Sequence, residues 1–483
     1  MMNITFVPEP ELEFGAGKHI DIRFGIMNYG PLDVDSSLAP KDIALGIIGT
    51  KESIEGAADW FQKCKVEVSA KVSKQPNLFP RFPGFDEDRA FYSRLVIDPS
   101  LCRDLPKTEL LSLGAIKNRK LRIEKAVQLF VDEIKYLAQN TAAKVIVCAL
   151  PLILLPHIAP APKARSAESE DEPQDVIGGQ VDFHDMLKAN AMSFKKPIQL
   201  ILPSTYDESA RGKQKKSGLV RTLQDEATRA WNIHSALYYK AGGTPWRLER
   251  SSSDLTVCYI GISFYKSLDR SKLLTSVAQV FNERGEGVVV RGGAASISKE
   301  DRQVHLLETD AFGLLKDALA RYRDVHKNAP ARVVVHKSSS FNQAEVSGFQ
   351  LAAKESNIDV VDLLHLSPSS CRLYRGGQYP PLRGTVLTLD DENMLMYPRG
   401  SVEFFETYPG KYIPVPLLVK LAQSEQTQRF LAREILSLTK MNWNKTQFDG
   451  SEPITLTASR QVSAVLRYCP EGFELEPRYS FYM

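Results

Sequence analysis

Apolar and polar residues alternate along the chain in a way that predicts two successive α/β regions. In the first region, apolar runs typical of buried strands occur at 42–50, 93–98, 144–150 and 197–203. Stretches with the spacing of amphipathic helices lie between these runs, at 51–67, 118–140 and 182–194. Strands that alternate with helices favour a parallel, Rossmann-like sheet.

The pattern restarts after Trp246. Strand-like runs follow at 253–267, 286–294, 331–340 and 357–367, and helical stretches at 310–330, 342–356, 427–444 and 454–469. The first forty residues are rich in Pro, Gly and Asp and predict extended arms and turns. We therefore expect an N-terminal segment over 1–40, one α/β domain over 41–248 and a second over 249–483.

Composition narrows the class of protein. Hydrophobic residues make up 43% of the chain and charged residues 25%, as in ordinary soluble globular proteins. The net charge is only +3, so a nucleic-acid surface would have to be a local basic patch. The six cysteines form no CxxC pair, which indicates a reducing cytoplasm. The N-terminus does not resemble a signal peptide, and the most apolar run (144–160) is shorter than the roughly 20 residues that span a bilayer.

A basic stretch, "ARGKQKKSGLVR" at 210–221, contains no acidic residue. Its cations are Arg211, Lys213, Lys215, Lys216 and Arg221. Such a run is either a solvated loop or a phosphate site at the edge of the first sheet, where α/β folds bind ligands. The residues alone leave both interpretations open.

Lys240 stands at the end of a predicted helix, in "YYKAGG", directly before two glycines. A lysine in this place either faces the negative end of the helix dipole or binds an anion. A helix from Leu223 to Ala241 would be about 27 Å long, so Gln224 could not grip one phosphate together with Lys240 unless the helix began near Ala227. Lys213 and Gln214 could instead fold back beside Lys240.

Five stretches together resemble a known family. "NIHSALYYKAGGTPWRL" is similar to the end of the MID domain of Argonaute proteins, and "TVCYIGISF" and "ARVVVHKSSSF" to two strands of the PIWI domain. "LTKMNWNKTQFDGSEPITLTASRQVSAVL" resembles the PIWI C-terminal region, and "FGAGKHIDIRFGIMNYGPLD" the N-terminus of short prokaryotic members. The resemblance covers nearly the whole chain. It implies a Rossmann-like MID domain followed by an RNase H-like PIWI domain.

The resemblance also implies a pocket for the 5′-phosphate of a guide strand. Lys240 matches one family lysine directly, whereas Lys213, Gln214 and Gln224 match the other positions loosely. A Mg²⁺ ion and the carboxylate of Met483 would complete the pocket. Two family positions depart from the pattern, because Ser209 and Ala236 stand where a tyrosine and a second lysine are found. Further nucleic-acid contacts are expected from Arg211, Lys215, Lys216, Arg221 and His336.

Slicing members of the family hold two metal ions with carboxylates, which offset the metal charge. The aligned positions in this chain are Ser263, Lys337 and Ser459, and none of them is a carboxylate. A cation at Lys337 would repel a metal ion. Asp254, Asp269 and Glu283 occur in this region but outside the matching register. We therefore expect a catalytically inactive PIWI domain.

The resemblance thus implies a sensor in a prokaryotic defence system. The chain would bind a guide RNA and a complementary single-stranded DNA target in the cytoplasm, with no membrane attachment. It would form a heterodimer with an APAZ-containing effector, more often a TIR or sirtuin-like NAD-degrading enzyme than a nuclease, and act against plasmids or phage. The alternative hypothesis is an RNase H-like nuclease that cleaves the guided target itself.

Overall fold

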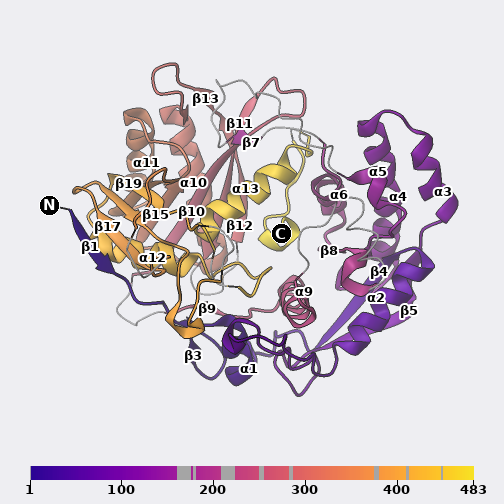
Figure 1. Ribbon diagram of the computed structural model, residues 1–483. Coiled ribbons are helices and arrows are strands. Elements are labelled where there is room, and N and C mark those ends of the chain that lie inside the picture. The colour runs from indigo at the N-terminus through magenta and orange to yellow at the C-terminus, as the bar shows by residue number, and fades with distance from the viewer. Residues whose placement is uncertain are drawn as a thin grey trace.

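The computed structural model describes residues 2–159, 176–177, 181–207, 224–249, 255–281, 287–374, 380–409, 413–447, 450–470 and 472–483. Its two sheet systems lie on opposite sides of the molecule, and the C-terminal segment lies between them (Figure 1). In the described ranges, no helix is both long and apolar enough to cross a bilayer. All six cysteines are free.

The first sheet has four parallel strands in the order β5-β4-β6-β8. The strands are β4 (Asp42–Gly49), β5 (Arg94–Asp104), β6 (Val145–Ala149) and β8 (Ile198–Ile201). Helices α4 (Arg119–Asn140) and α6 (Phe183–Ala191) share a buried cluster with one face of this sheet, and α2 (Lys51–Lys63) and α9 (Glu226–Lys240) with the other. This three-layer arrangement confirms the predicted Rossmann-like region.

The second sheet has ten strands and follows the order β1-β17-β18-β19-β16-β15-β10-β11-β12, with β7 beside β10. The strands are β1 (Asn3–Phe6), β7 (Val176–Ile177), β10 (Val257–Lys266), β11 (Leu273–Phe281), β12 (Gly287–Ala294), β15 (Arg332–Lys337), β16 (Val360–Pro368), β17 (Thr385–Thr388), β18 (Asn393–Met396) and β19 (Leu417–Gln423). The central strands β10, β15 and β16 are parallel, and the strands outside them are mostly antiparallel.

Helices cover both faces of the ten-stranded sheet. Helices α10 (Glu308–His326) and α11 (Gln343–Glu355) pack on one face, and α12 (Gln428–Leu438) and α13 (Ile454–Leu466) on the other. Helix α13 lies directly on β10, because a Cβ atom at Gly261 would come within 2.0 Å of the Thr455 carbonyl oxygen. Glycine at this position therefore permits the close approach of helix and strand.

The remaining elements are short. They are β2 (Leu12–Glu13), β3 (Lys18–His19), α1 (Ile22–Tyr29), η1 (Pro76–Leu78), α3 (Lys107–Ser112), η2 (Leu113–Ala115), α5 (Leu155–Ile158), η3 (Met192–Phe194), α7 (Pro203–Tyr206), β9 (Arg247–Leu248), β13 (Ser296–Ile297), β14 (Val304–His305), η4 (Glu403–Phe405) and η5 (Tyr479–Phe481).

The N-terminal residues are more structured than extended arms and turns. Helix α1 is capped by the Asp21 side chain, β1 forms the edge of the ten-stranded sheet, and β2 pairs with β9 at the junction of the two regions. A buried ion cluster of Glu9 with Arg383 and Lys440 fixes this segment to the second region. The segment therefore joins both regions instead of standing apart from them.

Candidate functional site

Lys240 is buried at the end of α9, with 6% of its surface exposed. Its Nζ atom donates hydrogen bonds to the Ile198 carbonyl oxygen at 3.0 Å, to Gln199 Oε1 at 2.6 Å and to the Met483 main-chain oxygen at 3.3 Å. The side chain therefore turns back onto strand β8 and the C-terminal segment. Gln199, which the sequence interpretation did not include, is the glutamine that contacts Lys240.

A second buried lysine faces the same segment. Lys188 lies on α6, is 3% exposed, and donates from Nζ to the Tyr482 carbonyl oxygen at 3.1 Å. Burial lowers the pKa of Lys188 to about 7, although Asp185 and Asp182 partly oppose this effect. Burial also lowers the pKa of Lys240 well below its ordinary value, and the positive charge of Lys188 adds to the effect.

The C-terminal segment is held firmly between the two regions. Tyr479, Phe481, Tyr482 and Met483 are all buried, and the Tyr482 hydroxyl donates to the Glu476 carbonyl oxygen at 2.9 Å. The Tyr482 carbonyl oxygen and a carboxylate oxygen of Met483, the last residue, thus contact the two buried lysines. No side-chain carboxylate in the described ranges is hydrogen-bonded to either lysine. Two buried lysines so close together favour an anionic counter-charge, and the Met483 carboxylate supplies one at Lys240.

The structure separates Gln224 from this pocket. Helix α9 begins at Glu226, with Asp225 as its N-cap, and Lys240 is its last residue. Fourteen residues at 1.5 Å each place the two ends about 21 Å apart. Gln224 lies beyond the far end, where its side chain accepts a hydrogen bond from Asn232 at 3.1 Å. Arg211, Lys213, Gln214, Lys215, Lys216 and Arg221 lie outside the described residues.

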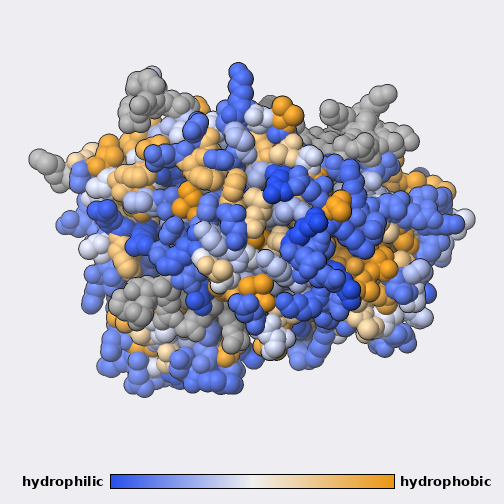
Figure 2. Space-filling model, turned by 90° about the horizontal axis from the view of Figure 1, so that it is seen from below, coloured by the Kyte–Doolittle hydropathy of each residue, from blue (hydrophilic) through white to orange (hydrophobic). Residues whose placement is uncertain are grey.

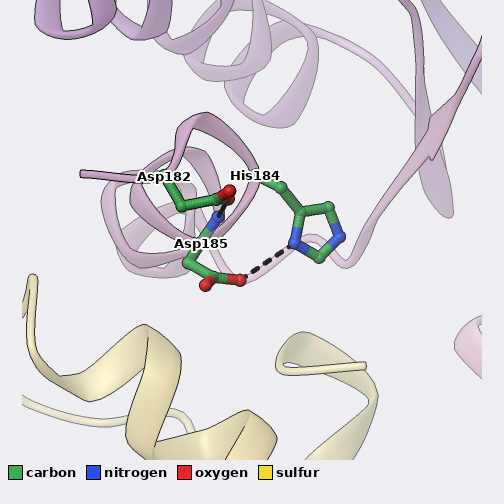
Figure 3. Close-up of side chains that lie close together, drawn as sticks. All are labelled: Asp182, His184 and Asp185. Carbon is green, nitrogen blue, oxygen red and sulfur yellow. Dashed lines mark hydrogen bonds and ion pairs between the residues drawn. The ribbon is translucent and has the colours of Figure 1, made fainter. Parts of the chain in front are cut away.

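Three potential metal ligands gather at the start of α6 (Figure 3). The ligand atoms of Asp182, His184 and Asp185 lie within 4.8 Å of one another. Asp182 caps the helix by accepting a hydrogen bond from the Asp185 main-chain nitrogen, and His184 Nδ1 lies 3.0 Å from Asp185 Oδ1. Helix capping accounts for this arrangement, since Asp and Asn are common N-cap residues.

Ser263, one of the positions that the resemblance aligned with a metal-binding carboxylate, is packed against another serine hydroxyl in the second region. Ser263 on β10 lies 2.8 Å from Ser463 on α13, measured between their Oγ atoms, and both side chains are fully buried. Ser459, which the resemblance pointed to, is one turn away on α13 and donates to the Leu456 carbonyl oxygen at 3.0 Å. Ser463, rather than Ser459, therefore meets Ser263.

Lys337 does not lie beside Ser263, contrary to the sequence interpretation. Ile262 is in register with Lys337 on the neighbouring strand β15. The residue of β15 opposite Ser263 is therefore Ser338, which is also buried. Side chains alternate along a strand, and Lys337 therefore points to the opposite face. There it contacts Glu345 on α11 at 2.5 Å. Lys337 thus repels no metal ion at Ser263, and Ser338 is the second uncharged residue on that face.

His336 is not a groove residue that meets backbone phosphate. It is 1% exposed and its Nδ1 atom lies 2.8 Å from Thr455 Oγ1 on α13. Burial lowers the pKa of His336 to about 3, with a further contribution from Arg332. The imidazole is therefore neutral and serves to attach α13 to β15.

Comparison with known proteins shows the fold. No protein-family model and no curated protein matches the sequence. Among solved structures, 99% of the chain matches Clostridium butyricum Argonaute bound to a guide DNA and a 19-mer target DNA, with TM-score 0.64 and 14% identity, and covers 55% of that protein. It likewise matches Drosophila Piwi with TM-score 0.56 and 11% identity, over 99% of this chain and 56% of that protein. The match to Marinitoga piezophila Argonaute in complex with 5′ OH guide RNA has TM-score 0.56 and 11% identity, over 99% of this chain and 59% of that protein.

The chain thus spans little more than half the length of these structures. The four-stranded region and the ten-stranded region together reproduce the α/β fold predicted from the resemblance, a Rossmann-like MID unit followed by an RNase H-like PIWI unit. The chain therefore has the MID–PIWI fold found in Argonaute and Piwi proteins.

Proposed function

We propose that the protein binds a guide strand through the pocket at Lys188 and Lys240 and uses the guide to bind a complementary target. The observation that carries this proposal is the pair of buried lysines beside the C-terminal segment, neither of them hydrogen-bonded to a side-chain carboxylate, in a fold shared with guide-binding Argonautes. The guide is an RNA with a 5′-phosphate, and the target is single-stranded DNA. Base pairing reads the sequence, while the protein reads backbone shape and charge.

Guide-dependent target binding tests this function. A labelled single-stranded DNA is titrated with the full chain, either alone, with a complementary guide RNA, or with a scrambled guide. The complementary guide should tighten target binding by about a hundredfold or more, since pairing supplies stacking of about 1.4 kcal/mol per base-pair step. Equal target binding with complementary and scrambled guides contradicts the proposal. Salt must be matched, because phosphate contacts release counterions.

We propose that Mg²⁺ and the Met483 carboxylate take part in guide binding only when the guide phosphate is present. The described oxygens beside the lysines belong to the Ile198 and Tyr482 carbonyls, the Gln199 amide and the Met483 carboxylate, and the lysine side chains already bind them. This set does not fit a Mg²⁺ ion alone, because it offers a single carboxylate and the two lysine charges would repel the ion. We derive no step through the ion. A peptide tag after Met483 should weaken guide binding, and an N-terminal tag should not.

Target cleavage by this chain is the alternative function. It would need carboxylates to hold two metal ions, and Ser263, Ser338 and Ser463 offer only hydroxyls, enclosed by α13. We therefore propose a catalytically inactive PIWI unit. Incubation of guide, labelled target and protein in Mg²⁺ or Mn²⁺ should leave the target intact. A cut that moves with the guide sequence would establish the nuclease instead.

We further propose that activity resides in a partner, an APAZ-containing effector of the TIR or sirtuin-like type that degrades NAD when guide and target are bound, as defence against plasmids or phage. Strand β1 ends the ten-stranded sheet and exposes Ile4 and Phe6, and Met2 directly before it is exposed too, with 62%, 46% and 71% of their surfaces accessible. Apolar groups also gather in places on one face of the molecule (Figure 2). Exposed apolar edge strands favour pairing with another chain.

The partner is tested by producing the chain with and without the product of the neighbouring reading frame. A stable heterodimer should form, and NAD should be consumed only when both guide and target are added. Replacing Ile4 and Phe6 by Lys should weaken the heterodimer, while replacing the equally exposed but distant Leu111 should not. NAD loss with guide alone, or full function without any partner, contradicts this part of the proposal.

A further inference from the structure

Helices α10 and α11 cover only part of the width of the ten-stranded sheet. The buried cluster beneath them takes strand residues from β10, β12, β15 and β16, and Leu363 on β16 belongs to it. Strands β19, β18, β17 and β1 follow β16 towards the edge of the sheet, on the side of the molecule away from the four-stranded region (Figure 1). Among the described residues, none from these four outer strands belongs to the cluster beneath α10 and α11.

The register of the outer strands places four apolar side chains in one row. Ile4 on β1 lies opposite Leu387 on β17. Leu387 in turn lies opposite Leu395 on β18, and Leu395 lies opposite Leu418 on β19. Directly opposed residues of antiparallel strands project to the same face, so the row crosses all four strands. Ile4 is 62% exposed, and Leu387 and Leu418 are partly exposed.

This apolar row, defined by Ile4, Leu387, Leu395 and Leu418, lies on the same face of the sheet as α10 and α11. Leu418 pairs with Ser367 on β16, and Ser367 is four residues after Leu363, so the two side chains of β16 share a face. The other face of the outer strands is already buried under α12. It contributes Val386, Met394, Met396, Leu417 and Val419 to the core.

The uncovered width is suited to one further helix. Neighbouring strands are about 4.8 Å apart, so β1 lies about 19 Å from β16, four strand spacings away. Packed helices are about 8–10 Å apart, so a single helix placed beside α11 would lie over the apolar row. A sheet face that carries apolar side chains is normally buried by such a layer.

The charges around the row indicate the chemistry of that helix. Lys420 is exposed and lies two residues after Leu418, on the same face. Lys354 on α11 is exposed one turn after Gln350, whose Nε2 atom donates to Gln423 Oε1 of β19 at 2.7 Å, so it lies on the β19 side of α11. The side next to α11 is therefore basic. The β17–β18 turn, at one end of the row, is acidic over residues 390–392.

We propose that the apolar row is the docking site of one amphipathic helix of the partner protein, which continues the layer of α10 and α11. The helix presents an apolar stripe to the row and acidic side chains to Lys420 and Lys354. This inference rests on the proposed partner that pairs with β1. It adds a second contact to that partner, since a strand beside β1 and a helix over the row would bury one continuous surface.

The experiment titrates the full chain into the labelled product of the neighbouring reading frame and measures Kd. Leu387→Lys and Leu418→Lys should each raise Kd about tenfold or more, because each places a charge beneath the docked helix. Thermal unfolding of each variant without the partner reports that it is folded. Val325→Lys makes the same substitution at a 41% exposed position of α10, outside the row, and should leave Kd unchanged.

Charge variants at Lys420 test the site without disturbing the apolar side chains. Lys420→Glu should raise Kd about threefold or more, because it repels the acidic side chains, while Lys420→Arg should retain the native Kd. Exposed charge pairs contribute modestly, so this effect is smaller than that of the leucine variants. Salt should weaken the native complex more than the Lys420→Glu complex.

Three results overturn the inference, and they are distinguishable. If Ile4→Lys with Phe6→Lys raises Kd but the Leu387, Leu418 and Lys420 variants do not, the partner binds β1 alone and the proposed partner stands. If the isolated chain forms a dimer that Leu418→Lys dissociates, a second copy of this chain occupies the row instead. If the native chain does not bind the product of the neighbouring reading frame, the proposed partner fails and the docking site fails with it.

Discussion

Each region of the molecule buries lysine side chains, but among the described residues only those of the ten-stranded region are paired with a side-chain carboxylate. In the ten-stranded region, Lys337 is fully buried and its Nζ atom lies 2.5 Å from Glu345, which is also fully buried. In the four-stranded region, Lys188 and Lys240 contact main-chain oxygens and one amide. Removing one partner of a buried ion pair is strongly destabilising, so the pair in the ten-stranded region is structural, whereas the lysines of the four-stranded region can accept an external anion without breaking such a pair.

The Lys337–Glu345 pair has further hydrogen-bond partners within the protein. Glu345 accepts hydrogen bonds from the main-chain nitrogens of Leu306 and Asn342, and its Oε2 atom lies 3.0 Å from His305 Nδ1. Lys337 also donates to the Ser340 carbonyl oxygen at 2.8 Å and lies over the Phe341 ring. This network ties α11 to the β13–β14 hairpin. Within this network Lys337 has a side-chain counter-charge and a second acceptor from the protein itself.

The largest expected effect comes from breaking the Lys337–Glu345 pair. Glu345→Gln leaves a fully buried ammonium group without its counter-charge, and should lower the free energy of unfolding by about 3–5 kcal/mol. The measurement is urea unfolding followed by circular dichroism. Glu355→Gln removes the exposed partner of Lys316 and is the control. It should change the free energy of unfolding by less than about 1 kcal/mol. A similar small change for Glu345→Gln would show that the pair is not structural.

Acid should destabilise both regions through buried histidines. Burial lowers the pKa of His234 in the four-stranded region and of His365 in the ten-stranded region to about 4 each. The unfolded histidine titrates near pH 6.5, so these groups have no effect on stability above that pH. As the pH falls from 6.5 towards 4, the unfolded chain binds protons that the folded chain does not, and stability decreases.

At pH 5 each of these histidines should lower the free energy of unfolding by about 1–2 kcal/mol relative to pH 7. Urea unfolding of the native chain and of His234→Phe at both pH values measures this, since the substitution should reduce the loss. An equal loss in the two proteins would mean that His234 is not held neutral by the fold.

A smaller effect, of opposite sign to that of Glu345→Gln, is expected in the anion pocket. Lys188→Met removes a buried cation that has no hydrogen-bonded carboxylate, so without nucleic acid the protein should be as stable as the native chain or gain about 1 kcal/mol. Lys337→Met should instead lose stability, because Glu345 remains buried and unpaired. Thermal unfolding of both variants without guide decides this. Equal losses would erase the distinction between the two regions.

Most of the regular elements in both regions followed from the sequence, because they are long and strongly periodic, but the strands β11 and β19 were not predicted. The four-residue strands β17 and β18 were not predicted, and neither was the pairing of β1 with β17, in which Asn3 meets Thr388. Such short strands carry little periodic signal, and contacts between residues so far apart in the chain leave no local pattern.

The site was only partly predictable for related reasons. The glycine pair marked the helix end at Lys240, but Lys188 has no motif around it, and its partner Tyr482 is 294 positions away. The orientation of Lys337 was missed because a shift of one residue along a strand moves a side chain to the other face. The prediction that Gln224 lies beside Lys240 was wrong, because their separation depends on where the helix begins. The sequence did not fix that start, which the structure places at Glu226.

The most direct test of the account is the preference of the native chain for the guide's 5′ end. Fluorescence anisotropy with two otherwise identical guide RNAs, at equal and moderate salt, gives the two Kd values. We expect the 5′-phosphorylated guide to bind about tenfold or more tightly, because its phosphate would make charge-assisted contacts with the buried lysines Lys188 and Lys240. Equal Kd values for the phosphorylated and hydroxyl guides would contradict the claim that Lys188 and Lys240 bind the guide phosphate.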